Sequence, residues 1–266
     1  MNNKSKSVVL IGAGNVATSL AEALRGKREI IQVYSKTQAH AKVFGQKLKC
    51  SFTNDLKKIS PDAGLYIIAV KDDAIAKVSE KLKLPGKLVI HTSGSTELSI
   101  LKKISDKNGV LWPMYSFAGK AELVPETPFF IEASSLKDKT ELTALVKELQ
   151  GKPYYMDTQK RMMLHMAAVF ANNFPNHLFA IAESLCKEVE VPFRLFLPLV
   201  QEALHNIEKK SPALTQTGPA SRNDKLILNR HLALLSKDKK LKRYKEVYQV
   251  LTESIIETSR EGRKKR

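Results

Sequence analysis

Two patterns of apolar and polar residues follow each other along the chain. Up to about residue 157, short apolar runs rich in β-branched residues alternate with stretches of helical spacing. Beyond that point the apolar positions recur every three or four residues over long stretches, which indicates helices alone. We therefore predict an α/β domain over residues 1–157 and an all-α domain over residues 158–266. The predicted strands cover residues 8–11, 29–34, 50–53, 63–70, 87–91, 109–114, 129–132 and 151–157, and their alternation with helices predicts a parallel sheet.

A glycine-rich turn joins the first predicted strand to the first predicted helix. The turn has the pattern G-x-G-x-x-A, formed by Gly12, Gly14 and Ala17. Gly12 permits the tight turn, Gly14 lets the backbone approach a pyrophosphate, and Ala17 lets the helix pack closely on the strand. The helix that opens at Asn15 and Val16 offers unpaired N–H groups to phosphates. The alternative is an ordinary glycine turn, but the position between strand and helix favours a Rossmann dinucleotide-binding domain.

The end of the second predicted strand, residues 29–34, indicates which dinucleotide is bound. An NAD site carries an acidic residue there for the ribose 2′-hydroxyl. This chain has Ser35, Lys36 and Thr37 instead, and these side chains suit the 2′-phosphate of NADP. Alternatively, Ser35 and Thr37 cap the next helix while Lys36 is solvated, and both interpretations can hold together.

Two further strand ends carry polar or turn residues. Because ligands bind at the carboxyl ends of parallel strands, Val70 and Lys71 are expected to lie along the cofactor. His91 ends the strand at 87–91 and precedes Ser93 and Ser95. These residues predict a polar pocket floor in which His91 touches substrate or nicotinamide, the alternative being a structural hydrogen bond.

The first helix of the second domain, residues 160–189, is apolar on most faces, and we predict that it is buried. His165, Asn172 and Asn176 fall on one face at helical spacing, and Pro175 predicts a kink. His165 is the candidate proton donor and Asn172 a candidate for orienting substrate, because imidazole titrates near neutral pH. The alternative is structural packing.

The remaining helical domain is predicted to contain helices at 192–208, 224–235 and 239–259, with Pro198 kinking the first of them. The connection 216–224 is dense in hydrogen-bond donors. Within it, Arg222 could bind a substrate carboxylate, or Asp224 could merely cap the next helix.

Composition changes this picture little. The formal net charge is +17, but the lysines are scattered and no nucleic-acid motif accompanies them, so we expect a solvated surface and no specific nucleic-acid partner. Cys50 and Cys186 have no metal-binding or disulfide spacing, which is typical of a reducing cytoplasm. No apolar run reaches the length of a membrane span, and we expect a cytoplasmic protein without metal.

The motifs together resemble a known family of two-domain proteins with a Rossmann domain and a C-terminal helical domain of unknown function. The resemblance covers nearly the whole chain and rests on residues 12–17, 34–37, 91–95, 165–174 and 216–224, the last two being the specific ones. Members are often described as NADP oxidoreductases of the deazaflavin-dependent type. More distantly the chain is similar to pyrroline-5-carboxylate reductase and the β-hydroxyacid dehydrogenases.

The resemblance implies a homodimer formed through the helical domains, with the active site between the two domains. In the β-hydroxyacid dehydrogenases a lysine one turn before an asparagine on this helix does acid–base work, and this chain lacks that lysine. His165 is expected to take the role. The predicted function is hydride transfer between NADP(H) and a small polar carbonyl, imine or hydroxy compound. The alternative is an NADP-binding sensor or scaffold without turnover.

Overall fold

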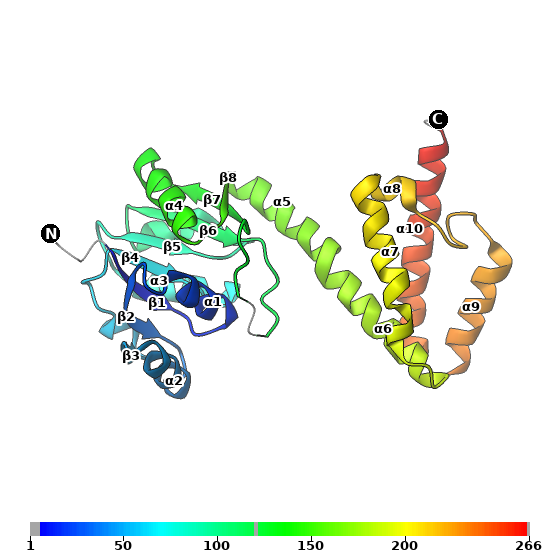
Figure 1. The fold of residues 1–266 in the computed structure, drawn as a ribbon, viewed down its shortest axis with the longest axis horizontal. Coiled ribbons are helices and arrows are strands. Elements are labelled where there is room, and N and C mark those ends of the chain that lie inside the picture. The colour runs from blue at the N-terminus through cyan, green and yellow to red at the C-terminus, as the bar shows by residue number, and fades with distance from the viewer. Residues whose placement is uncertain (1–5, 120–121, 265–266) are drawn as a thin grey trace. The chain divides into compact units, whose positions relative to one another are not determined.

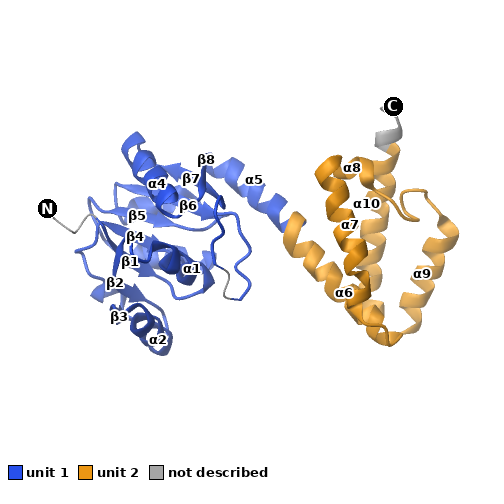
Figure 2. Cartoon of the chain, viewed as in Figure 1, with its two compact units in different colours: residues 1–170 blue, residues 171–266 orange. Residues whose placement is uncertain are grey.

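The computed structural model describes residues 6–119 and 122–264, with the main chain alone from 261 onward. Two compact units make up the chain, Met1–Phe170 and Ala171–Arg266 (Figure 2). The domain boundary predicted near residue 157 coincides with the start of helix α5 (Thr158–Ala168), whereas the two units divide just beyond the end of this helix. Helix α5 therefore belongs to the same compact unit as the sheet.

The first unit is built on a sheet of eight strands within the described residues, in the order β3-β2-β1-β4-β5-β6-β7-β8 (Figure 1). This order, with β1 and β4 at its reversal point, is that of a Rossmann domain and confirms the predicted fold class. The strands are β1 (Ser7–Ile11), β2 (Glu29–Tyr34), β3 (Ser51–Thr53), β4 (Leu65–Ile68), β5 (Leu88–His91), β6 (Asn108–Pro113), β7 (Pro128–Ala133) and β8 (Lys152–Tyr155).

One strand pair departs from the predicted parallel sheet. Strand β7 runs antiparallel to β6, and β8 runs parallel to β7. The reason lies in the connections: no helix crosses from β6 to β7 among the described residues, so the chain returns in the opposite direction, whereas helix α4 (Leu136–Glu148) links β7 to β8. The prediction that all strands are parallel is therefore wrong for β7 and β8.

Helices cover both faces of the sheet. The side chains of β1 alternate, so that Val8 and Leu10 join the core under α1 (Asn15–Leu24), α2 (Gln38–Leu48) and α4. Val9 and Ile11 join the opposite core under α3 (Asp72–Lys81). Strands buried on both faces are apolar throughout, which explains the continuous apolar run in this part of the sequence.

The second unit is helical. It contains α6 (Phe174–Glu188), α7 (Leu197–Lys209), the short α8 (Pro212–Thr215), α9 (Lys225–Lys237) and α10 (Lys245–Lys264). Helix α9 packs on α10, which also contacts α8. A π-helical turn, Val169–Asn173, joins α5 to α6. Pro175 follows in the first turn of α6 and has no N–H group to continue the α-helical pattern.

Two predictions about these helices are wrong. Pro198 does not kink a helix but lies in the first turn of α7, where its missing N–H group is not needed. The helix from residue 160 is also not buried, because Met163 and Phe170 are each 64% exposed. In α5 the described side chain that is fully buried is the charged Arg161. Among the described residues, no helix combines the length and the apolar character needed to cross a bilayer.

Candidate functional site

The register of the sheet aligns five residues in one row across the first unit: Ile11, Ile68, His91, Val110 and Glu132. For β1, β4 and β5 this row marks the carboxyl edge, where ligands of such sheets bind. The glycine turn, the start of α3 and the loop after β5 all leave the sheet directly beyond it. Residues 92–97 after β5 are called the β5 loop below.

The glycine turn has room for a phosphate. Gly12 has a positive φ of 131°, and a Cβ atom there would collide with the carbonyl group of Ala69 after β4. A Cβ atom at Gly14 would instead meet nothing within 4 Å. Gly14 is also the N-cap of α1 and provides no side chain to cap it. The N–H groups at the start of α1, in Asn15 and Val16, therefore adjoin open space, which fits a pyrophosphate.

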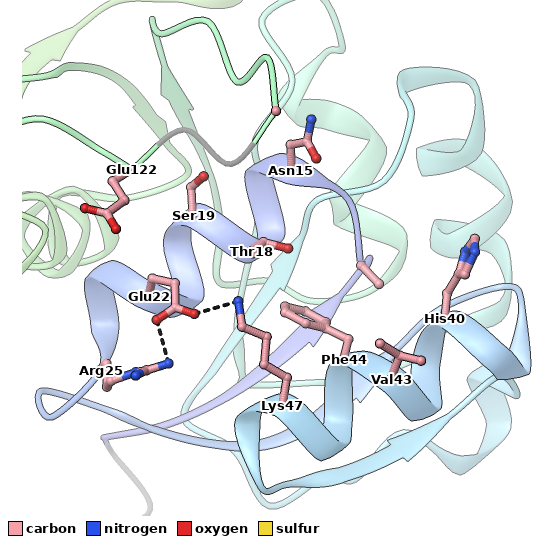
Figure 3. A pocket seen from close by; sticks show the side chains of 12 residues that line it. Asn15, Thr18, Ser19, Glu22, Arg25, His40, Val43, Phe44, Lys47 and Glu122 are labelled. Atoms are coloured by element: carbon pink, nitrogen blue, oxygen red, sulfur yellow. Dashed lines mark ion pairs between the residues drawn. The ribbon is translucent and has the colours of Figure 1, made fainter.

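The side chain of Asn15 has a different role from its main chain. Its Nδ2 donates a hydrogen bond of 2.7 Å to the carbonyl oxygen of Phe117, in the connection between β6 and β7. Beside it, a cavity of about 610 Å³ extends between α1 and α2 (Figure 3). Glu22 there forms ion pairs with Lys47 at 2.8 Å and Arg25 at 2.6 Å, and the hydrogen bond from Lys47 lowers the pKa of Glu22. Of the predicted cofactor residues only Asn15 lines this cavity.

The residues after β2 keep their side chains available. Lys36 and Thr37 are exposed, and Ser35 is half-buried with its N–H donated to the carbonyl of Thr53 at 3.1 Å. Thr37 is the N-cap of α2, but its side chain makes no capping hydrogen bond. After strand β4, on the other side of β1, Val70 is half-buried and Lys71 is exposed as the N-cap of α3. The hydroxyl groups of Ser35 and Thr37 and the ammonium group of Lys36 thus lie at the N-terminus of α2.

His91 is fully buried. Its Nδ1 accepts a hydrogen bond of 3.2 Å from the Ser93 N–H, so the ring proton belongs on Nε2. Burial lowers the pKa of His91 to about 4, and the Arg161 guanidinium adds to this shift, against weaker opposite effects of the Glu97 carbonyl and the Asp72 carboxylate. The imidazole is therefore neutral at physiological pH, and its hydrogen bond with the Ser93 N–H helps to hold the β5 loop in place.

Serine side chains organise the β5 loop. The Ser93 hydroxyl accepts hydrogen bonds from the N–H groups of Ser95 at 3.1 Å and Thr96 at 2.9 Å. The Ser95 hydroxyl donates to the carboxylate of Asp72, at the start of α3, over 2.5 Å. This bond ties the β5 loop to the segment after β4, where the cofactor is expected.

Helix α5 brings His165 to the β5 loop. The ring of His165 is half-buried and lies against Gly94, where an added Cβ atom would be 2.5 Å from the His165 Cδ2. The ring also lies near Trp112 of β6, at 5.6 Å between ring centroids and 58° between planes. Asn172 lies in the second unit and is exposed, as is Arg222, while Asp224 caps α9 by accepting from the Ile227 N–H.

Sequence reasoning missed three residues of this site: Trp112, Glu132 and Arg161. Arg161 is fully buried and forms an ion pair of 2.9 Å with Glu132 of β7. In a lysine-rich chain, the sequence alone does not distinguish a buried arginine on a predicted helix from a solvent-exposed one. The available signal was its spacing of four residues from His165, which places both side chains on one face of the helix.

Two family models match the chain. A Rossmann-like domain matches residues 1–114, and a domain of unknown function, DUF2520, matches residues 127–255. A protein from Bacteroides fragilis, named for a suggested NADP oxidoreductase activity, is 38% identical over 96% of this chain and all of its own, with a TM-score of 0.86. The chain belongs to this Rossmann-like DUF2520 family. No curated protein matches it in sequence.

The fold of this DUF2520 protein extends to more distant proteins. A Thermotoga maritima protein is 22% identical with a TM-score of 0.69, over 96% of this chain and 99% of its own. A reductive aminase from Aspergillus terreus, in complex with NADPH and ethyl-5-oxohexanoate, is 16% identical with a TM-score of 0.65, over 97% of this chain and 95% of its own. These likenesses concern the two-domain fold.

Proposed function

We propose that this DUF2520 protein is an NADP-dependent oxidoreductase. It transfers a hydride between the cofactor and a small polar carbonyl, imine or hydroxy compound. The observation that carries the proposal is the pairing of two features at one sheet edge: an open glycine turn at Gly14, and Ser35, Lys36 and Thr37 where an NAD site would have an acidic residue. The suggested activity of the Bacteroides fragilis relative supports it.

The residues fit NADP in three places. The main chain of Gly12, Gly14, Asn15 and Val16 would hold the pyrophosphate, and Val70 and Lys71 would lie along the cofactor. Ser35, Lys36 and Thr37 would hold the 2′-phosphate, with Lys36 as a point charge rather than a bidentate fork. When bound, the nicotinamide supplies the hydride, and the protein supplies orientation and a proton.

His165 is the proposed proton donor. It is the imidazole of this edge that is both partly accessible and in contact with the β5 loop, whereas His91 is buried and neutral. His91 would position the loop through Ser93, and Asn172 would orient the substrate. We expect His165→Ala to reduce turnover about 100-fold or more with NADPH affinity retained, as the loss of general acid–base catalysis predicts.

The cofactor proposal is tested by titrating the purified protein with NADPH and NADH in parallel, by fluorescence or calorimetry. We expect tighter binding of NADPH, and we expect Lys36→Glu to remove that preference by repelling the 2′-phosphate. Lys42→Glu makes the same charge change at an exposed position further along α2 and should leave the preference intact. Equal or absent binding of both nucleotides by the wild type would refute the proposal.

The second candidate is an NADP-binding sensor or scaffold. It is favoured by Ala168, which stands one turn before Asn172 where the β-hydroxyacid dehydrogenases have their lysine. Tight NADPH binding without oxidation across a panel of carbonyls and imines would support this candidate over the enzyme.

We also propose that the protein is a homodimer through its helical unit. Large apolar side chains remain exposed on these helices, among them Phe174, Leu178 and Leu185 of α6 and Leu199 and Leu204 of α7. Apolar surface of this kind on a folded chain marks an interaction site.

A further inference from the structure

Arg161 is an unusual residue in helix α5, because arginine is rarely buried without a specific partner. Its Nη1 donates to the carbonyl of Ser93 at 3.0 Å, and its Nη2 donates to the carbonyl of Thr96 at 2.8 Å. The same Nη2 donates to Glu132 Oε2 at 2.9 Å. The guanidinium group therefore joins three segments, namely α5, the β5 loop and β7.

These contacts bracket the part of the loop that faces His165. Ser93 and Thr96 flank Gly94 and Ser95, so the guanidinium holds both ends of this short segment. Glu132 is fixed in turn, since it accepts hydrogen bonds of 2.9 and 2.8 Å from the Thr158 hydroxyl in the first turn of α5. The antiparallel strand β7 thus supplies the counter-charge that keeps an arginine in this position.

His165 follows Arg161 by one helical turn, and both side chains face the β5 loop. We propose that Arg161 is a positioning residue: by clamping the β5 loop to α5 it holds Gly94 beneath the imidazole of His165 and holds that imidazole against Trp112. The proposal rests on the proposed function only in treating His165 as the proton donor. Arg161 itself is fully buried and would touch neither substrate nor cofactor.

The planar guanidinium is essential to this clamp. It donates to two carbonyl oxygens and a carboxylate in fixed directions, whereas a lysine presents a single ammonium group on a flexible chain. Lysine would preserve the ion pair with Glu132 and lose part of the hold on the loop. Arg161→Lys should therefore lie between the wild type and Arg161→Met in every readout of loop position.

The chain contains a single tryptophan, Trp112, so its fluorescence reports on this contact without cofactor or substrate. Because the imidazole of His165 lies against the indole, His165→Gln should change the Trp112 emission relative to the wild type. In Arg161→Met the Trp112 emission should change in the same direction as in His165→Gln. Acrylamide should also quench Trp112 at least twice as effectively, because the loop no longer covers it.

Arg28→Met is the matched control. Arg28 forms a similar pair with Glu148, at 2.6 Å and 3.1 Å, but it lies at the opposite end of the sheet from the β5 loop. We expect it to leave the Trp112 signals unchanged. Where Arg161→Met fails to fold, Glu132→Gln keeps the shape of the partner and removes its charge, and should shift both signals in the same direction by a smaller amount.

A folded Arg161→Met protein with wild-type Trp112 quenching and emission overturns the proposal. So does a His165→Gln protein with wild-type Trp112 emission, because the imidazole would then not lie against Trp112. Neither result depends on turnover. A failure of the oxidoreductase proposal would appear separately, as absent NADPH binding, and a failure of the proposed role of His165 would appear as unimpaired turnover by His165→Ala.

Discussion

At the scale of single residues, two glycines of the site should respond in opposite ways to the same substitution. Gly14→Ala adds a methyl group where nothing lies within 4 Å, so folding should lose less than about 1 kcal/mol, while NADPH affinity falls at least about tenfold. Gly94→Ala drives a methyl group into His165 and Trp112, 2.5 and 2.8 Å away. Such overpacking should cost about 1–3 kcal/mol of unfolding free energy.

Urea denaturation and NADPH titration of both variants check this contrast. We expect Gly94→Ala to retain NADPH binding, because in the proposed site the phosphates bind at the glycine turn and not at the β5 loop. Equal NADPH affinity of Gly14→Ala and wild type would show that the open space at Gly14 is not where the pyrophosphate lies.

His91 makes stability depend on pH. Its pKa of about 4 in the folded chain lies below the ordinary 6.5, so unfolding takes up a proton between these values. The stabilisation is complete above pH 6.5 and is lost as the pH falls toward 4. Between pH 7 and pH 5 the loss from this residue should be about 2 kcal/mol.

The measurement compares urea denaturation of the wild type and His91→Gln at both pH values. Glutamine retains an acceptor for the Ser93 N–H but does not titrate. The variant should therefore show a smaller fall in unfolding free energy than the wild type. Identical pH slopes in the two proteins would contradict the buried, neutral state of His91.

At the scale of elements, the sequence predicted those features that depend on a single local pattern of residues. Apolar runs gave the strands, and the glycine pattern gave the β1–α1 turn, because both depend on neighbouring residues. The direction of β7 was not predictable in this way, since an apolar run such as Phe129–Ile131 reads the same in either direction. Direction is decided by the connection before the strand, which contains no crossing helix within the described residues.

The site was predicted only in part for a similar reason. His165 and the β5 loop were recognised from their residue types, but the contact between them depends on Arg161. That residue is stabilised by Glu132, 29 positions earlier in the chain. The burial of helix α5 was overestimated because an apolar face requires a partner, and the partner need not belong to the same chain.

Asp224 gives a prediction for helix α9. Its carboxylate accepts a hydrogen bond of 3.2 Å from the Ile227 N–H and caps the helix. Asp224→Ala should lower the unfolding free energy by about 1 kcal/mol, and Asp224→Asn should restore most of it, because asparagine is an equally good cap. Thermal denaturation of the two variants measures this difference. Equal losses of unfolding free energy in both variants would point to a role for the negative charge.

At the scale of the whole molecule, the dimer is the prediction that accounts for the exposed apolar helices. Light scattering after size exclusion should give twice the chain mass of 29.8 kDa at micromolar concentration. Phe174 and Leu178 share one face of α6 and are 48% and 37% exposed. Burying each in an interface is worth about 1.5–3 kcal/mol, so the double variant Phe174→Lys/Leu178→Lys should be monomeric.

Glu183→Lys provides the control, because Glu183 is exposed nine residues beyond Phe174, on the opposite face of α6. It should remain dimeric. A monomeric wild type would leave the apolar face of α6 without a second copy to cover it. A monomeric double variant that still binds NADPH would place cofactor binding within one chain, as expected for a site formed by the glycine turn and the end of β2.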